Sequence, residues 1–464
     1  MARVEQQGAT GRAAATPAGK LALFGWVLFD WATQPFYTLV VTFLFAPYFV
    51  NGFMDDPARG SSLWAYATGI AELIAAALAP VLGAIADAGT PRKPWIAAFS
   101  VLLFVGLCGL WFAIPGEIEL APRVLFSFGL ATIGAELATV FTNAMMPSLI
   151  GNHRLGTLSG IGWATGYVGG LVSLALIAGL VVADPHTGKT LLGLLPVLPL
   201  DTATREGDRL VGPFSAVWFL VFVLPLFLFT PDRPGKPLKT GAVTAGLSQL
   251  VRSVKELVRH HVEIAKFLLA RMLYADGLGG APTEYRASID AAELGRFGVI
   301  LTITGTLGAA LGGLLDDREG SKAVIVGTLL LFIAASIGVL SVDHDHVLFV
   351  VPVEPKALGS APFSSVGEQI YLAFAMLIGI ASGPIQSSSR TLLARMCPED
   401  KVTEFFGFFS FSGKITAFAA PLAIGAVTHV TGSPRIGIAM SLVFLIAGLL
   451  LLLRVKSDRH VSYT

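Results

Sequence analysis

A short loop sequence occurs twice in this chain, at matching places of two halves. GAIADAGTPRK at Gly83–Lys93 returns as GGLLDDREGSK at Gly312–Lys322, with Gly first, Asp fifth and Lys eleventh in both copies. Each copy follows a long apolar stretch and precedes another. A loop used twice in this way predicts a duplicated membrane protein, and duplicated membrane bundles of this size are mostly transporters.

Composition supports the membrane assignment, because one buried core could not hold so many apolar residues. The 464-residue chain is 54% hydrophobic and 14% charged, whereas soluble proteins carry about 25% charged residues. The formal net charge of +1 gives no basis for binding nucleic acid. Cys108 and Cys397 lie far apart in the sequence and predict no disulfide framework.

Apolar runs of spanning length fall into two sets of six. A membrane-spanning helix needs about 20 mostly apolar residues. We therefore predict an all-α membrane protein with twelve transmembrane helices in two six-helix halves. The predicted spans cover residues 21–50, 62–86, 94–114, 122–147, 155–183, 213–231, 264–284, 295–315, 322–341, 367–392, 402–430 and 434–454.

The polar segments complete the predicted domain organisation. Residues 1–20 form an N-tail without the compact apolar region of a signal peptide, and residues 455–464 form a C-tail. The N-terminal half covers 21–231 and the C-terminal half covers 264–454. Between them, residues 232–263 combine a Pro-rich basic linker with apolar residues at helical spacing, a pattern typical of an amphipathic helix on the membrane surface. A solvated linker helix is the alternative.

The distribution of Lys and Arg predicts the orientation in the membrane. These residues are more frequent in the tails and in the loops on the same side as the tails than in the loops on the other side. The positive-inside rule then places both termini in the cytosol. The short loops are typical of a multi-pass protein of the bacterial inner (plasma) membrane.

The repeated loop combines residue types that suit a contact between helix ends. Gly83 and Gly312 permit close helix approach. Asp87 and Asp316 lie where a carboxylate can meet a basic partner or the N-terminus of a neighbouring helix. Such a contact holds two helices together in one conformation and releases them in another, so we predict a cytosolic gate; a plain positive-inside turn is the alternative. The basic residues of these gating loops, which we place at the lipid headgroup level, are Arg92, Lys93, Arg318 and Lys322.

Ionisable residues inside the predicted spans are the candidates for the transport site. A charge at the bilayer centre costs roughly 2.5–3.5 kcal/mol on insertion scales, and a water-filled cavity between the halves would keep it from lipid. Arg271 also lies in a span, without an assigned role. Each of these charges has a structural alternative, as an anchor or an ion pair. We predict substrate contact or proton coupling for Asp30, Glu72, Glu136, Asp276, Arg390 and Lys414.

Motifs of catalysis and of cofactor binding are not found in the sequence. There is no Walker loop, no zinc-protease helix motif and no nucleophile–base pair. The DHDH tract at Asp343–His346 offers metal-binding side chains, but we interpret it as a solvated loop. We therefore expect no enzyme activity, no cofactor and no resident metal.

The repeated loop resembles the loop signature of the major facilitator superfamily, found between its second and third spans and again between its eighth and ninth. FDWATQPFYTLVVTFLFAPYF at Phe29–Phe49 resembles the first span of one branch, the autophagy-related vacuole effluxer-like family. GPIQSSSRTLLARMCP at Gly383–Pro398 and EFFGFFSFSGKITAFAAPLAIG at Glu404–Gly425 are similar to the same family. The resemblance implies transport by alternating access, and because fungal members are linked to amino-acid efflux from the vacuole, it implies an amino acid or similar small zwitterion as substrate.

The leading hypothesis is thus a secondary transporter of a small solute in the lipid bilayer. Asp30 or Glu72 would bind an ammonium group or a coupling proton, and Lys414 or Arg390 would bind a carboxylate. Protons are a candidate co-substrate, because a carboxyl in apolar surroundings binds them more readily. One alternative is export of a lipid-like or amphipathic compound, which the FFGFFSF segment would favour if it faced the cavity. A second alternative is a non-transporting membrane receptor or assembly factor.

Overall fold

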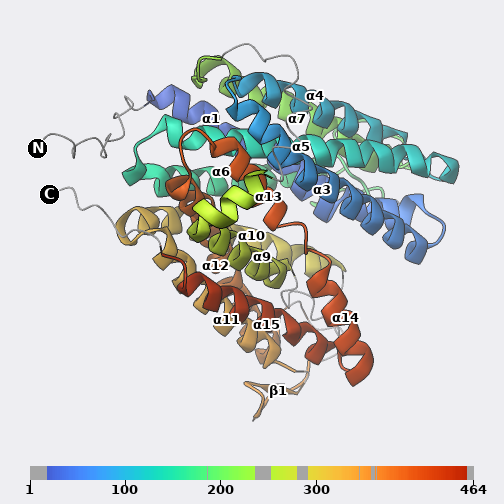
Figure 1. Cartoon of the computed structure of the whole chain (residues 1–464). Coiled ribbons are helices and arrows are strands. Elements are labelled where there is room, and N and C mark those ends of the chain that lie inside the picture. The colour runs from blue at the N-terminus through green and yellow to red at the C-terminus, as the bar shows by residue number, and fades with distance from the viewer. Residues whose placement is uncertain are drawn as a thin grey trace, which may run out of the picture.

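The computed structural model is almost entirely helical and forms two bundles that lie side by side (Figure 1). The predicted N-tail up to residue 17, the predicted linker over 236–251 and the C-tail from residue 457 lie outside the described residues. The structure describes residues 18–184, 187–235, 252–279, 291–343, 345–356, 361 and 363–456, without the side chains of 291–296.

The first bundle begins with a long rod whose helix type changes along its length. α1 (Lys20–Pro35) ends at Pro35, and the chain continues directly as the π-helix η1 (Phe36–Phe43). Proline lacks the N–H that an α-helix needs, which explains a change of hydrogen bonding at this point. The rod goes on through α2 (Phe45–Tyr48) and η2 (Phe49–Phe53). The other elements of this bundle are α3 (Pro57–Asp87), α4 (Lys93–Gly109), η3 (Leu110–Phe112), η4 (Ile118–Leu120), α5 (Ala121–Leu149), η5 (Asn152–Arg154), α6 (Leu155–Leu180) and α7 (Glu206–Phe229).

A helical segment over residues 252–260 precedes the second bundle in the chain. Glu256 in this segment forms an ion pair with Lys401 of the second bundle. This ion pair ties the described part of the predicted amphipathic helix to the second bundle. A hairpin of two short antiparallel strands, β1 (His346–Val347) and β2 (Val351–Pro352), joins two of its helices. The helices are α9 (Val262–Gly279), α10 (Ala291–Glu319), α11 (Ser321–Leu340), α12 (Val366–Met396), α13 (Val402–Ser412), α14 (Ala419–Thr431) and α15 (Pro434–Leu453).

Ten helical rods among the described residues are long and apolar enough to span a membrane. They match the predicted spans except for the seventh and the eleventh. The seventh corresponds to α9, which carries Lys266, Arg271 and Asp276 within its length. The prediction of a continuous helix over 402–430 is wrong, because α13 ends at Ser412, a turn covers residues 413–418, and α14 starts at Ala419.

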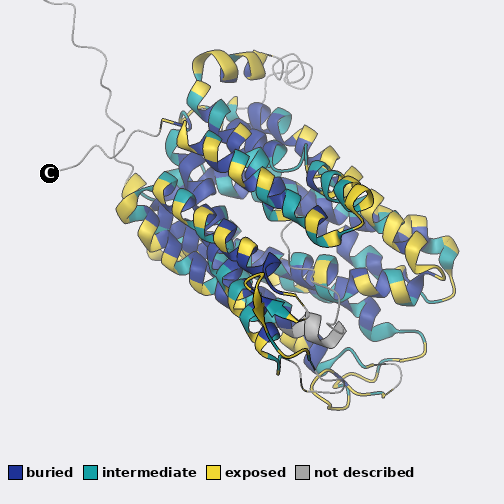
Figure 2. Ribbon diagram, turned by 90° about the horizontal axis from the view of Figure 1, so that it is seen from below, coloured by how far each residue is buried: buried dark blue, intermediate teal, exposed yellow. Residues whose placement is uncertain are grey.

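Large apolar side chains cover the outer surfaces of both bundles. Exposed residues, coloured yellow on the ribbon in Figure 2, lie mainly on the outside of the molecule, and buried residues, coloured dark blue, lie mainly on its inner side. Phe24, Ile70, Leu73, Leu330 and Leu450 are all at least half exposed. A surface of this kind in water would be an extended apolar patch. Lipid therefore covers it, and the helices satisfy their backbone hydrogen bonds internally, as a bilayer requires.

The two bundles meet mainly along two helix pairs, α3 with α13 and α6 with α10, and α12 and α13 add contacts with α6 and α5. The described chain enters α1 and leaves α15 on one side of the molecule, at the left of Figure 1, which we call the terminal face. Glycines line both contacts near this face. A Cβ atom on Gly83 would lie 2.6 Å from the carbonyl oxygen of Thr403, and one on Gly160 would lie 2.5 Å from that of Ala309. The close approach of the bundles therefore requires residues without side chains.

Replacing Gly160 by alanine should loosen this contact. The new methyl group would meet backbone atoms, which cannot move aside, so we expect a destabilisation of about 1–3 kcal/mol. The melting temperature of the purified protein measures it. Gly327→Ala on α11 is the matched control, because a Cβ there meets nothing within 4 Å. Equal melting temperatures for the two variants would contradict a tight α6–α10 contact.

Candidate functional site

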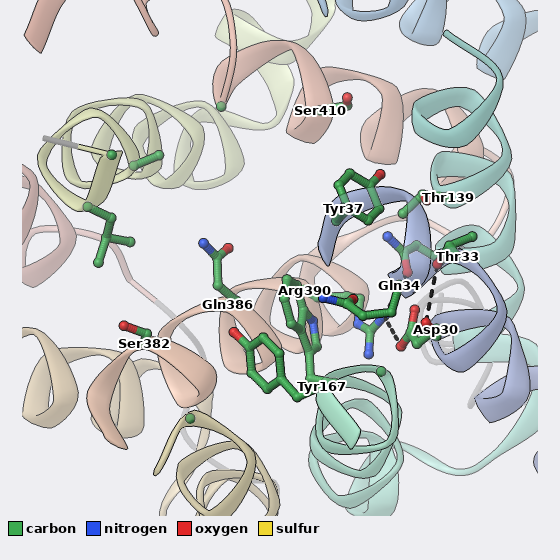
Figure 3. A pocket seen from close by; sticks show the side chains of 18 of the residues that line it. Asp30, Thr33, Gln34, Tyr37, Thr139, Tyr167, Ser382, Gln386, Arg390 and Ser410 are labelled. Carbon is green, nitrogen blue, oxygen red and sulfur yellow. Dashed lines mark hydrogen bonds and ion pairs between the residues drawn. The ribbon is translucent and has the colours of Figure 1, made fainter. Parts of the chain in front are cut away.

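A cavity of about 720 Å³ lies between the bundles. The helices α1, α5 and α6 line it from one side, and α9, α10, α12 and α13 line it from the other. Figure 3 shows that most of its labelled side chains carry a hydroxyl, amide or charged group. Phe332, Phe406 and Phe409 add apolar wall. Such a mixed lining suits a small polar solute that is held by a few converging groups.

Arg390 is the centre of a network that joins the two bundles. Its Nη1 lies 3.2 Å from Asp30 Oδ2 and donates to Asn143 Oδ1 at 2.9 Å. Its Nε and Nη2 donate to the hydroxyl and carbonyl oxygens of Ser159 at 2.9 and 2.8 Å, and the guanidinium lies 5.0 Å from the centroid of the Trp26 ring. The ion pair with Asp30 is visible in Figure 3. The network ties α12 to α1, α5 and α6.

Lys414 is the centre of a second inter-bundle cluster. From the turn after α13, its Nζ lies 3.1 Å from Glu72 Oε1 and 3.2 Å from Glu136 Oε1. The hydroxyl of Tyr37 donates to the same oxygen of Glu136 at 3.2 Å. Glu136 and Lys414 line the cavity, while Glu72 reaches Lys414 from α3. Two carboxylates share one ammonium group, so this wall carries one excess negative charge when all three groups are ionised.

Arg271 is a cavity residue that has no carboxylate partner among the described residues. Its Nη1 donates to the carbonyl oxygen of Phe409 at 2.6 Å and to Ser412 Oγ at 3.2 Å. The guanidinium lies 3.5 Å from the centroid of the Phe409 ring, which is a cation–π contact. Arginine has five N–H donors, and the two on Nη1 are the only ones with an acceptor in the described part of the chain. The sequence shows this charge, but it does not show that the guanidinium has no acid partner among the described residues.

The structure divides the predicted transport residues into three groups. Asp30 pairs with Arg390, and Lys414 binds both Glu72 and Glu136. Asp276 stands apart, because it is buried and lies outside the cavity lining. Three other polar residues of these networks were not predicted, although each is a polar side chain inside an apolar run: Tyr37, Asn143 and Ser159. Gln386, which lines the cavity, was not predicted either.

The first copy of the repeated loop binds the start of a helix in the other bundle. Asp87, the last residue of α3, accepts hydrogen bonds from Thr403 Oγ1 at 2.7 Å and from the Glu404 backbone N–H at 2.8 Å. Both donors belong to the first turn of α13, where a carboxylate satisfies free N–H groups and the helix dipole. Arg233 Nη2 and Arg92 Nη2 lie 3.1 and 3.8 Å from the same carboxylate. Asp87 thus has both the basic partner and the helix N-terminus that its position predicts.

The second copy makes the corresponding contact with a neighbouring aspartate. Asp317 accepts hydrogen bonds from the backbone N–H groups of Gly156 at 2.8 Å and Thr157 at 2.7 Å, in the first turn of α6. Arg395 Nη2 lies 2.9 Å from Asp317. The two copies therefore lock α3 onto α13 and α10 onto α6, related by a pseudo-twofold arrangement. Between described residues, no hydrogen bond or ion pair joins the bundles at the face opposite the terminal face.

Gly312 and Asp316, which the repeat aligns with Gly83 and Asp87, contact residues of their own bundle, among them a basic partner for Asp316. A Cβ on Gly312 would meet Pro384 in the same bundle, and Asp316 lies 2.6 Å from Arg395 Nη1. Gly313 instead packs against α6, and it precedes Asp317 by four residues, as Gly83 precedes Asp87. Residues four apart lie on one helix face. Because glycine and aspartate are each doubled in the second copy, the sequence does not show which glycine and which aspartate lie on the helix face that contacts the other bundle.

Three of the basic loop residues contact protein groups in the structure. Arg92 is 4% exposed, and burial lowers its pKa to about 10, so it is protonated at neutral pH. Lys93 Nζ donates to the Phe227 carbonyl oxygen near the end of α7, and Lys322 Nζ donates to the Val455 carbonyl oxygen just after α15. A cation at a helix C-terminus is stabilised by the helix dipole. Among the four, only Arg318 is exposed.

The DHDH tract lies beside the β1–β2 hairpin, except for His344, which lies outside the described residues. Asp343 pairs with Arg435 at 2.8 Å, and Asp345 bonds to the ring of His346 at 2.8 Å. Within the described ranges, no group of three or more His, Cys, Asp or Glu side chains is arranged to hold a metal ion. The described part of the tract therefore forms surface contacts.

Comparisons with known proteins agree on the family and the fold. A family model described as "Vacuole effluxer Atg22 like" matches residues 52–462. The MFS-type transporter YxiO of Bacillus subtilis (strain 168), itself described as uncharacterized, is 23% identical over 443 residues, which cover 93% of this chain and 94% of YxiO. Autophagy-related protein 22 of Yarrowia lipolytica is 26% identical over 333 residues, and this chain spans about half its length.

Solved structures similar to this chain include a major facilitator superfamily transporter and a homologue of an iron transporter. FucP in the outward conformation aligns with a TM-score of 0.66 at 14% identity, over 94% of this chain and 99% of FucP. A bacterial homologue of the iron transporter ferroportin, in an outward-facing state, aligns with a TM-score of 0.63 at 15% identity, over 94% and 98%. At this level of identity, the likeness shows the major facilitator fold.

Proposed function

The chain belongs to the vacuole effluxer Atg22-like family and is an MFS-type transporter, and from this premise we propose that it carries a small zwitterion, with an amino acid as the leading candidate. A substrate of this kind has a positive and a negative group a few bonds apart. Its binding site should therefore offer both charges to one cavity, close together and without competing protein partners.

The charge pattern of the cavity is the observation that carries this proposal. Arg271 offers N–H donors that no described acceptor uses, and a guanidinium can bind a carboxylate through two parallel hydrogen bonds. The cluster around Lys414 has one carboxylate in excess, of which Glu136 faces the cavity. We infer that Arg271 binds the substrate carboxylate and Glu136 its ammonium group. Lys414 and Arg390, the residues expected to bind the carboxylate, are both held by protein acids.

Alternating access supplies the mechanism. The bundles are locked at the terminal face by Asp87 and Asp317, so substrate would enter the cavity from the opposite face. Release of both locks would let the bundles rock about the cavity and open it at the terminal face. With both termini in the cytosol of a bacterial cell, as the Lys and Arg distribution predicts, the conformation described is the one that faces outward.

An amphipathic substrate is the second candidate, because part of the Phe-rich segment faces the cavity. Phe406 and Phe409 line it together with Leu301 and Phe332. An apolar tail would pack on these side chains, and a single charged headgroup would suit Arg271. This substrate would leave the excess charge near Glu136 unmatched, which is why the zwitterion is preferred.

The test is a ligand screen of the purified protein by thermal shift. Binding to the native state raises apparent stability by mass action, by about 2.7 kcal/mol at a hundredfold excess over Kd. We expect amino acids to raise the melting temperature and Arg271→Gln to weaken that binding at least tenfold. Lys266→Gln is the matched control, since Lys266 lies on the same helix but pairs with Glu263 outside the cavity.

Two outcomes would contradict the proposal. Amino-acid binding that survives in Arg271→Gln would remove Arg271 from the site. Shifts with amphiphiles alone, equal in the native protein and the variant, would favour the second candidate.

A further inference from the structure

Asp276 in α9 is a buried carboxyl group without an ion-pair partner among the described residues. The residue is 5% exposed, and neither of its carboxylate oxygens has a hydrogen-bond partner among the described residues. The other acids predicted to lie within the spans, Asp30, Glu72 and Glu136, each have a cationic partner within 3.2 Å. An uncompensated carboxylate in this position would carry a large desolvation penalty. Among the described residues, no cation neutralises it.

A polar group beside Asp276 belongs to a helix break. Thr416 lies beside the carboxyl, in the turn at residues 413–418 that separates α13 from α14. Its hydroxyl is also buried without a hydrogen-bond partner of ordinary geometry. A hydroxyl can accept a hydrogen bond from a protonated carboxyl or donate one to a carboxylate, so small movements of the turn would favour one form of Asp276 over the other.

No charged group balances Asp276 from the elements packed against α9. Glu368 on α12 forms an ion pair with Lys356. Lys414 in the turn forms ion pairs with Glu72 and Glu136. Arg435 on α15 forms an ion pair with Asp343. His429 on α14 is exposed at the surface. On α9 itself, Arg271 bonds to Phe409, and Tyr274 bonds to Ser389. Within the described residues, none of these groups forms an ion pair with Asp276.

We propose that Asp276 carries the coupling proton of this transporter, at a site separate from the substrate cavity. A proton needs only one carboxylate oxygen, where it forms an O–H bond, whereas a metal cation such as Na⁺ or Ca²⁺ needs several oxygen ligands. In the conformation described, the carboxyl is buried, and the proton keeps it neutral. When the bundles rock and water reaches the turn, the O–H bond breaks and the proton passes to water. This inference rests on the proposed transport function.

The turn at 413–418 provides the link between the proton and the substrate. Lys414 and Thr416 are two residues apart in it, and Lys414 holds Glu136 at the cavity wall. A substrate ammonium group at Glu136 would compete with Lys414 and pull on the turn. Movement of the turn would shift Thr416 relative to Asp276 and so change how firmly the proton is held.

The first experiment detects the proton without any substrate. Infrared spectroscopy of the purified full-length protein distinguishes a protonated carboxyl from a carboxylate by its C=O stretching band. We expect the protonated band at neutral pH to be lost in Asp276→Asn and to persist in Asp345→Asn, a control in the exposed hairpin region. A band unchanged in Asp276→Asn would overturn the proposal. NaCl could also raise the melting temperature of the native protein above its value in choline chloride, without doing so in Asp276→Asn. That result would show that Asp276 binds sodium and not a proton.

The second experiment measures proton movement in liposomes that contain a pH-sensitive dye, with an equimolar mixture of amino acids as the probe. We expect the native protein to move protons when the mixture is added. Asp276→Asn, which resembles the neutral form, should still exchange amino acids but move protons at least tenfold more slowly. Amino-acid exchange without proton movement in the native protein would overturn the coupling and leave the proposed function intact. If Asp276 were protonated but the protein bound no amino acid, the proposed substrate would be contradicted, whereas the protonation of Asp276 would stand.

Discussion

Replacing Arg390 by glutamine is expected to lower the melting temperature and to abolish transport, because the change leaves Asp30 without its cation. Arg390 also supplies the hydrogen bonds that join α12 to Asn143 and Ser159 across the bundle boundary. Removal of one partner from a buried ion pair typically costs 3–5 kcal/mol. The Asp30 side chain is 19% exposed, so we expect a loss near the lower end, about 3 kcal/mol. Denaturant or thermal unfolding in detergent measures it.

A double-mutant cycle separates the charge pair from the packing of the long side chain. Asp30→Asn together with Arg390→Gln removes both charges, so part of the stability lost in Arg390→Gln should return. Arg435→Gln is the control, because it breaks the more exposed pair with Asp343, and such pairs contribute at most about 1 kcal/mol. If Arg390→Gln were no more harmful than Arg435→Gln, the network would not be holding the bundles together.

Neutralising the two locking aspartates should open the terminal face. Asp87 and Asp317 each satisfy free N–H groups at the start of a helix in the other bundle, an interaction of about 0.5–2 kcal/mol for capping groups. We expect Asp87→Asn and Asp317→Asn each to shift the equilibrium toward the terminal-open state severalfold, and the double variant to shift it further. Hydrogen–deuterium exchange followed by mass spectrometry reports the result at the first turns of α13 and α6.

The same experiment tests which aspartate of the second loop is the lock. Asp87→Asn should speed exchange at α13 most, and Asp317→Asn should speed it at α6 most, so each variant controls for the other. Asp316→Asn should leave the α6 amides protected, because Asp316 bonds to Arg395 and Ser321 instead. If exchange at α6 became faster in Asp316→Asn but stayed unchanged in Asp317→Asn, Asp316 would be the residue that holds α6, as its position in the sequence repeat suggests.

The positions of most helices could be predicted from the sequence because the lipid bilayer constrains the backbone. A chain in a bilayer must satisfy its backbone hydrogen bonds within each span, so apolar runs of sufficient length mark the helices directly. Ten of the predicted spans meet that criterion in the structure. The two that do not are informative. α9 contains Lys266, Arg271 and Asp276, and α13 is separated from α14 by a turn. Both depart from the rule where the proposed substrate and proton sites lie.

The sequence alone determined the membrane class, the duplication, the family resemblance and a short set of charged candidates, because each of these depends on local composition or spacing. Only the tertiary structure decided how those charges combine. Arg390 and Asp30 are 360 residues apart, and no periodicity within a span predicts such a contact. The absence of a described acid partner for Arg271, the unbonded carboxyl of Asp276 and the one-residue shift from Asp316 to Asp317 likewise follow from which helix faces meet, a property of the packed bundles.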